Sequence, residues 1–211
     1  MELSAAILSI AVALTLGAMS PGPSFILVAR TSLGVSRRDG LAAAVGMGVG
    51  GVFFSAIALL GLLAILTAVP LLHLALKVLG GTYLVYLGYR IWRGARQPLV
   101  LERTSLQNYP TQARRSFVLG LVTQVSNPKT AVVYASVFAS LLPHNIPPFV
   151  QVALPIMVFA IETIWYSVVA LALSSPSPRT RYLASKAWID RTAGAIMSLL
   201  GLKLIFEAQQ P

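Results

Sequence analysis

The sequence has no cysteine, only two histidines and few charged residues, which make up 10% of its 211 residues. The absence of cysteine excludes disulfides, thiolate metal sites and cysteine nucleophiles. His73 and His144 lie beside prolines near the ends of apolar stretches. Metal chemistry therefore has almost no ligands, and we expect neither a metal nor a cofactor. An ordinary soluble domain has about 25% charged residues, so this scarcity of charge argues against a water-soluble protein.

What the chain has instead is apolar residues, 56% of the total, with a mean hydropathy of +0.78. They form six stretches, each long enough to cross a hydrocarbon core about 30 Å thick as a helix. Because a backbone in lipid must satisfy its own hydrogen bonds, the sequence predicts an all-α membrane protein with six transmembrane helices in a single domain, residues 1–211. The predicted spans lie near residues 4–33, 41–68, 71–92, 116–142, 148–174 and 187–207.

The 16 basic residues outnumber the six acidic ones, giving a formal net charge of +10. In a soluble domain this excess would suggest nucleic-acid binding. Here 13 of the 16 basic residues lie in alternate gaps between the apolar stretches, which is the pattern of the positive-inside rule. We therefore expect no nucleic-acid partner, a cytoplasmic linker at about residues 94–115, and both termini on the outer side of the membrane.

Two weak matches relate the halves of the chain. The third spans share two glycines at a shift of 113 residues: Gly81 and Gly88 in one half, Gly194 and Gly201 in the other. Pro23 matches Pro128 at a shift of 105 residues. Each half, about 1–93 and 116–211, then has three spans, and because three is odd the halves must be inverted relative to each other. Two inverted three-helix repeats of this kind are typical of alternating-access transporters.

The first predicted span, residues 4–33, would be about 45 Å long as one helix, which is too long for a bilayer without a break or a strong tilt. Pro21 and Pro23 predict a break, because proline lacks an N–H and clashes with the carbonyl group four residues before it. Gly22 between them lets the backbone turn.

The fourth span is predicted to break in the same way, at Pro128, with Asn127 as the N-cap of the following helix. In inverted halves, the N-terminal ends of the two half-helices would meet near the midplane, where their dipoles and Lys129 favour an anion. The alternative interpretation is that these prolines only kink their helices, as prolines often do in membranes.

Glu162 lies near the centre of the fifth span, where a charged group is costly unless it faces the bundle interior or a wet cavity. Trp165, Tyr166 and Val169 share its helical face. Two roles stay open for Glu162: a structural ion pair with Lys129, or a proton carrier that also binds a substrate ammonium. Both hold if the carboxylate exchanges the lysine for a proton.

Other patterns narrow the function. Gly46 and Gly50 form a Gly-x-x-x-Gly pair, which predicts close helix packing and no ligand role. The sequence has no P-loop and no dinucleotide-binding loop, so ATP-driven transport is not indicated. One buried carboxylate without histidine, cysteine or a second acid is a poor catalytic set, so we do not expect an enzyme.

These residues resemble the lysine exporter (LysE) superfamily, especially its homoserine/threonine efflux branch. The resemblance rests on residues 20–24 (SPGPS), 32–41 (SLGVSRRDGL) and 126–129 (SNPK), and on the acidic residue of the fifth span. It implies a bacterial inner-membrane exporter of amino acids or close derivatives, driven by proton antiport. The chain departs from the pattern at Ser24, where asparagine is usual, at Ser36, where glycine is common, and at Glu162, where aspartate is common.

We therefore expect a zwitterionic amino acid to bind at the midplane, with its carboxylate on the two N-terminal helix ends and its ammonium near Glu162. The released carbonyl groups of Gly17, Met19 and Gln124 are further acceptors for that ammonium. Glu162 is the expected proton-coupling residue. The expected substrate-binding residues are Ser20, Pro21, Gly22, Pro23, Ser24, Asn127, Pro128, Lys129 and Tyr166.

The expected partners are a small-molecule amino acid, protons and membrane lipid, and a homodimer is left open. The main alternative is a membrane protein that handles lipid or acts as a scaffold without solute transport. Cadmium or nickel export is disfavoured, because cysteine and intramembrane histidine are both absent.

Overall fold

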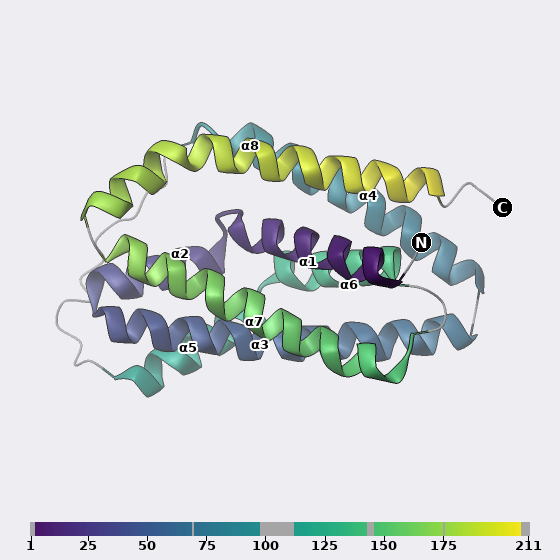
Figure 1. Ribbon diagram of the computed structural model, residues 1–211, viewed down its shortest axis with the longest axis horizontal. Coiled ribbons are helices and arrows are strands. Elements are labelled where there is room, and N and C mark those ends of the chain that lie inside the picture. The colour runs from purple at the N-terminus through teal and green to yellow at the C-terminus, as the bar shows by residue number, and fades with distance from the viewer. Residues whose placement is uncertain (1–2, 69, 98–111, 143–145, 175, 208–211) are drawn as a thin grey trace.

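Figure 1 shows an elongated bundle whose helices run along its long axis. The computed structural model describes residues 3–68, 70–97, 112–142, 146–174 and 176–207. Every regular element within these residues is a helix, so the prediction of an all-α protein is confirmed. The helices are α1 (Leu3–Met19), α2 (Pro23–Gly34), α3 (Arg37–Ala68), α4 (Pro70–Gly94), α5 (Ala113–Val125), α6 (Pro128–Leu141), α7 (Pro148–Leu173) and α8 (Pro176–Glu207). Residues 98–111 of the predicted linker and His144 lie outside the described residues.

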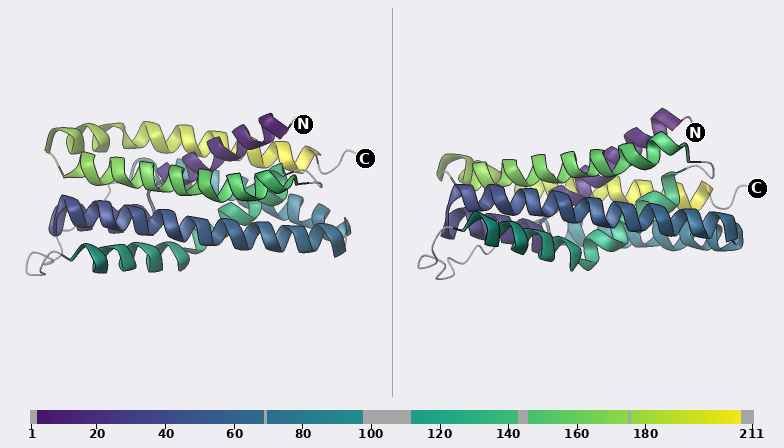
Figure 2. Two further views of the ribbon diagram at one scale, coloured as in Figure 1. Left: turned by 60° about the horizontal axis from the view of Figure 1, so that its bottom comes forward. Right: turned by 90° about the horizontal axis from the view of Figure 1, so that it is seen from below.

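Several helices are long and apolar enough to cross a membrane. Within the described residues, these are Arg37–Gly61 of α3 and Pro148–Leu173, and the pair α1 and α2, bent by 55° at the break between them, passes the same test as one broken span. The start of α1 and the end of α8 lie at the same end of the bundle (Figures 1 and 2). The number of six spans stays a prediction.

The largest extensions beyond the predicted spans are at the starts of α3 and α8. α3 begins at Arg37 rather than at residue 41, and α8 begins at Pro176 rather than at residue 187. A span prediction counts only apolar residues, whereas a helix continues until its backbone or its caps end it. Proline at the first helical position is compatible with the start of α8.

A buried carboxylate fixes where α3 and α5 begin. Ser36 Oγ accepts a hydrogen bond of 3.1 Å from the backbone N–H of Asp39, and the Asp39 carboxylate accepts one from Ser36 Oγ. This reciprocal arrangement resembles a capping box and caps the N-terminal end of α3. Asp39 Oδ1 also accepts from the backbone N–H of Gln112, at 3.1 Å, and from Ser116 Oγ, at 2.9 Å. One carboxylate therefore joins the N-terminal ends of two helices from different halves of the chain.

Glycines allow the closest helix pairs. A Cβ atom on Gly46 would lie 2.1 Å from the Phe117 carbonyl oxygen of α5, and one on Gly50 would lie 2.7 Å from Gln124 Cβ. The predicted close packing of these two glycines is therefore confirmed. α4 and α8 pack in the same way, since a Cβ on Gly88 would lie 2.4 Å from the Gly194 carbonyl oxygen.

The apolar core has two parts, and the polar residues described below lie where they meet. One cluster includes Tyr134 and Phe138, and the other includes Phe25 and Tyr166. Tyr134 and Tyr166 both line the small cavity that also contains Glu162. The site is therefore enclosed by packed side chains on both sides.

Candidate substrate-binding site

The first helix break lies between Met19 and Pro23, where the sequence predicts it. Gly22 is the N-cap of α2, has an extended backbone (φ −147°, ψ −168°) and provides no side-chain cap. Because Pro21 has no N–H, the Gly17 carbonyl oxygen loses its helical donor. That oxygen accepts a hydrogen bond of 3.0 Å from Lys129 Nζ, which also donates to the Ser20 carbonyl oxygen at 2.8 Å.

The second helix break lies between Val125 and Pro128. Asn127 is the N-cap of α6, as predicted, and its Oδ1 accepts from the backbone N–H of Lys129 at 3.1 Å. The backbone N–H of Asn127 donates to the Gln124 carbonyl oxygen at 3.1 Å. The carbonyl groups of Gly17 and Gln124 thus each accept a hydrogen bond from the protein, and their second lone pairs keep the expected role toward a substrate ammonium a prediction.

A buried chain of hydrogen bonds joins the two breaks. Ser24 Oγ, at the start of α2, donates to Gln124 Oε1 of α5 at 2.6 Å. Asn127 Nδ2 donates to Ser24 Oγ at 2.9 Å. The N-terminal ends of α2 and α6 therefore lie next to each other, as their predicted convergence requires.

Glu162 of α7 is only 3% exposed and faces the interior, not lipid. Its Oε1 accepts a hydrogen bond of 2.8 Å from the hydroxyl of Tyr134, and its Oε2 has no hydrogen-bond partner among the described residues. Among the described residues, Glu162 forms no direct ion pair with Lys129. Lys129 instead bonds the carbonyl groups at the first break, because those oxygens have lost their helical donors.

All ten predicted site residues line one or both of two adjoining cavities. The small cavity, of about 20 Å³, is lined by Ser20, Gly22, Ser24, Asn127, Lys129, Glu162 and Tyr166, among others. The large cavity, of about 650 Å³, is lined by Ser20, Pro21, Gly22, Pro23, Asn127, Pro128 and Lys129, among others. The first has room for about one water molecule and the second is in the size range of small-molecule sites. Lys129 lines both.

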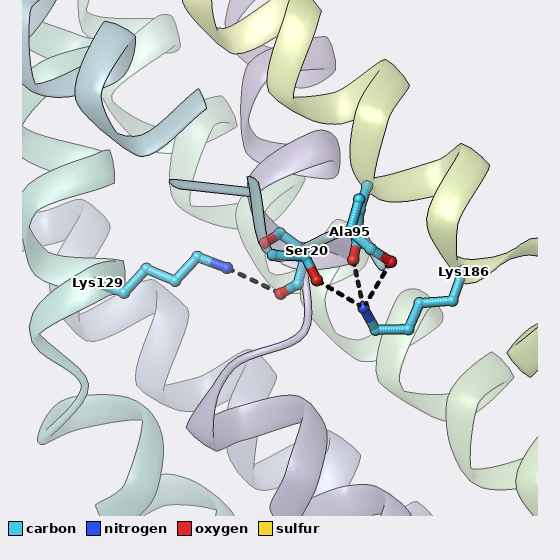
Figure 3. Close-up of polar contacts among 6 residues, drawn as sticks. Ser20, Ala95, Lys129 and Lys186 are labelled. Atoms are coloured by element: carbon cyan, nitrogen blue, oxygen red, sulfur yellow. Dashed lines mark hydrogen bonds and ion pairs between the residues drawn. The ribbon is translucent and has the colours of Figure 1, made fainter. Parts of the chain in front are cut away.

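The other wall of the large cavity was not predicted from the sequence. Arg90 of α4 and Lys186 and Asp190 of α8 line it, and Lys186 Nζ is 2.7 Å from Asp190 Oδ2. Figure 3 shows Lys129 and Lys186 pointing toward each other from opposite sides, with Ser20 and Ala95 between them. A signal was present, because Asp190 is an acid within the predicted span 187–207 and Lys186 precedes it by four residues.

Two further buried side chains hold the site. Tyr134 bonds Glu162, and Gln124, with no exposed surface, bonds Ser24. Gln124 Nε2 has no partner among the described residues. Gln124 could have been found from the sequence as a polar residue four positions before Pro128, in an otherwise apolar stretch. Tyr134 could not, because tyrosine is common in membrane helices.

Buried charged groups that line a cavity at two meeting helix breaks, inside an all-helical bundle, are typical of membrane transporters. No cluster of metal-ligating side chains occurs among the described residues. The chain belongs to the LysE type translocator family, whose model matches residues 15–208. The protein is therefore a membrane transporter and not an enzyme.

Curated relatives agree with this family. The chain is 32% identical to a threonine efflux protein of Escherichia coli K12 over 198 residues, which cover 94% of this chain and 96% of that protein. It is 33% identical to a threonine efflux protein of Salmonella typhi over 89% of this chain and 91% of that protein. An uncharacterized membrane protein of Haemophilus influenzae is 31% identical over 90% of this chain and 91% of its own length. No solved structure gives a significant match.

Proposed function

We propose that this protein exports a small zwitterionic amino acid of the threonine type across the bacterial inner membrane in exchange for protons. The observation that carries the proposal is the meeting of the two helix breaks at Lys129, with Glu162 on one side and a cavity of about 650 Å³ on the other. The names of the two threonine efflux relatives support an amino acid as substrate.

The charges of the site match those of a zwitterion. The N-terminal ends of α2 and α6 and the Lys129 ammonium favour the substrate carboxylate. The Gly17 and Ser20 carbonyl groups already bond Lys129, so Glu162 Oε2, which has no partner among the described residues, serves as the acceptor for the substrate ammonium in the small cavity. An amino acid is larger than the small cavity of about 20 Å³, so this cavity widens when the substrate binds.

Helix contacts support an inverted repeat of residues 1–93 and 116–211. The sequence matches Gly81 with Gly194 and Gly88 with Gly201, whereas in space Gly88 contacts Gly194 and Gly201 contacts Gly81. A two-fold axis between related elements exchanges contacts in this way. Likewise α1 contacts α6 while α2 contacts α5, and α2 contacts α7 while α6 contacts α3. Such symmetry favours alternating access about a fixed central site.

The direction of transport follows from the position of the large cavity. Arg90, Gly94, Gln97 and Lys186 line it, and the positive-inside rule assigns these regions to the cytoplasm. The substrate therefore enters the large cavity from the cytoplasm. Glu162 then binds its ammonium, and a proton taken up from the outside replaces the ammonium on the carboxylate when the substrate leaves.

The test is transport of radiolabelled L-threonine in proteoliposomes, by counterflow and with an imposed pH gradient. We expect counterflow and gradient-driven transport in the unmodified protein. Glu162→Gln is expected to lose gradient-driven transport, because glutamine carries no exchangeable proton. Gradient-driven transport that is unchanged in Glu162→Gln would remove this residue from the mechanism. A lipid-handling or scaffold protein would show no solute counterflow at all.

A further inference from the structure

The wall of the large cavity that is formed by α4 and α8 is not used in the proposed transport cycle. It carries Arg90, Lys186 and Asp190, and the helix breaks with Lys129 line the same cavity. Among the described residues that line this cavity, Asp190 is the only carboxylate and the other three charged residues are cations. A ligand that carries both an ammonium and a carboxylate matches this set of charges.

Asp190 is 2% exposed, and its two carboxylate oxygens differ in their contacts. Asp190 Oδ2 accepts from Lys186 Nζ at 2.7 Å. Asp190 Oδ1 has no hydrogen-bond partner among the described residues. A buried carboxylate oxygen without a donor is unfavourable, and in a transporter cavity the missing donor can be the substrate.

Glu162 has the same arrangement in the small cavity. One of its oxygens accepts from Tyr134 and the other has no partner within the described chain. Lys129 lines both cavities, so each of the two carboxylates lines a cavity that Lys129 also lines. A substrate that moves from the large cavity to the small one passes from one half-paired carboxylate to the next.

We infer that Asp190 is a second ammonium-binding carboxylate, whose Oδ1 receives the amino group of the substrate in the large cavity before the substrate reaches Glu162. This assignment rests on the proposed function. Lys129 and Arg90 are the partners for the substrate carboxylate in this first position. Lys129 Nζ has three N–H donors, of which two bond the Gly17 and Ser20 carbonyl groups.

The experiment uses inverted membrane vesicles from cells that overproduce the full chain, so that the cytoplasmic face is outside. Uptake of radiolabelled L-threonine is measured as a function of concentration. Asp190→Asn keeps the shape of the side chain and removes its charge. We expect it to raise the half-saturating concentration about tenfold, as for loss of a charge-assisted hydrogen bond, while the maximal rate changes less than about twofold.

Lys186→Gln is the matched control, because it breaks the same ion pair but leaves the carboxylate for the substrate. We expect its half-saturating concentration to stay the same or to fall, and we expect Asp190→Glu to restore tight binding in part. If Asp190 only pairs with Lys186, the two variants Asp190→Asn and Lys186→Gln will behave alike, and the assignment is overturned. Thermal melting in detergent shows whether each variant is folded. If Asp190→Asn does not fold, the half-saturating concentration of Lys186→Gln still tests the assignment, because a rise in it would contradict the expected result.

A second readout uses 3-hydroxybutyrate, which is threonine without its amino group, as a competitor. Asp190→Asn is expected to reduce the preference for threonine over 3-hydroxybutyrate about tenfold, because only threonine loses a contact. An unchanged preference overturns the role of Asp190 and leaves the proposed function intact. Absence of threonine uptake by the unmodified protein overturns the proposed function and this assignment together.

Discussion

The two helix breaks contain similar residues but are held in different ways. The break between α5 and α6 is capped by its own residues, because Asn127 bonds the backbone of Lys129 and its own N–H returns to Gln124. The break between α1 and α2 has no side-chain cap at Gly22, and the carbonyl groups at its other end bond Lys129 from the second half of the chain. The carbonyl groups at the first break therefore bond a residue of the other half, whereas the Gln124 carbonyl group at the second break bonds a residue of its own half.

The two breaks also differ at the second residue of the helix that follows each of them, α2 or α6. Ser24 and Lys129 each follow the first proline of their helix, and each reaches the first helix of the other half, at Gln124 or at Gly17. One carries a hydroxyl group and the other an ammonium. Two matched positions thus produce a site with a single positive charge. A contact of this kind can be exchanged during transport, because the ammonium can leave the α1 carbonyl groups for a substrate carboxylate or for Glu162.

The largest effect is expected from Lys129→Met. It removes the side chain that donates to the Gly17 and Ser20 carbonyl groups, and with it a cation of the site. We expect threonine transport to fall at least about a hundredfold and the free energy of unfolding to fall by about 1–3 kcal/mol. Transport in proteoliposomes and thermal melting in detergent measure the two losses. Arg93→Met, which removes an exposed cation at the end of α4, is the control and should change neither.

The next largest effect is expected from replacing the prolines, and its size should differ between the two breaks. Replacing Pro21 and Pro23 together by alanine lets α1 continue through the break, because both missing N–H groups return. Pro128→Ala leaves the Asn127 cap in place. We expect the double variant to lose more than about nine-tenths of transport and the single variant to keep at least about a third. Equal losses in both would contradict the view that only the second break caps itself.

A smaller effect is expected from Asn127→Ala. This change removes the cap of α6 and the donor to Ser24, for an expected loss of about 1–2 kcal/mol in the free energy of unfolding. Asn127→Asp is the comparison, since its carboxylate still caps the helix but cannot donate to Ser24. Thermal melting of the two variants separates the cap from the link between the breaks. A more stable alanine variant than aspartate variant would show that the cap contributes little.

The smallest effect is expected from Ser24→Ala, which removes one hydroxyl and leaves the Asn127 cap and the Lys129 hydrogen bonds at the first break in place. The loss of its bonds with Gln124 and Asn127 should cost about 0.5–1.5 kcal/mol. Because Ser24 also lines the small cavity, we expect the ranking of amino acids in competition with threonine to change. An unchanged ranking would assign Ser24 to the link between the helices alone.

The sequence predicted the local features of the site well. Pro21, Pro23 and Pro128 act on their own backbone, so the positions of both breaks could be predicted from residue type and spacing. Glu162 could be selected because an acid in an apolar stretch is costly. The partner of Lys129 stayed open, because the carbonyl groups that bind it lie more than 100 residues away in the chain.

The wall formed by α4 and α8 shows what the sequence pattern cannot give. Arg90, Lys186 and Asp190 looked like ordinary charges near predicted span ends, and only the packing of α4 on α8 brings them to the cavity that contains Lys129. Tyr134 likewise meets Glu162 only because α6 and α7 both face the small cavity.

The sequence by itself determined the helical class, the apolar stretches, the positions of the breaks and the acid in the interior, because each depends on the chemistry of a residue and its near neighbours. The tertiary structure alone decided which groups satisfy the freed carbonyl oxygens, which carboxylate oxygens keep no partner, and where the cavities lie. Those outcomes depend on hydrogen bonds between distant segments, and such bonds form only after close contacts at residues such as Gly46 and Gly88 have set the distances between helices.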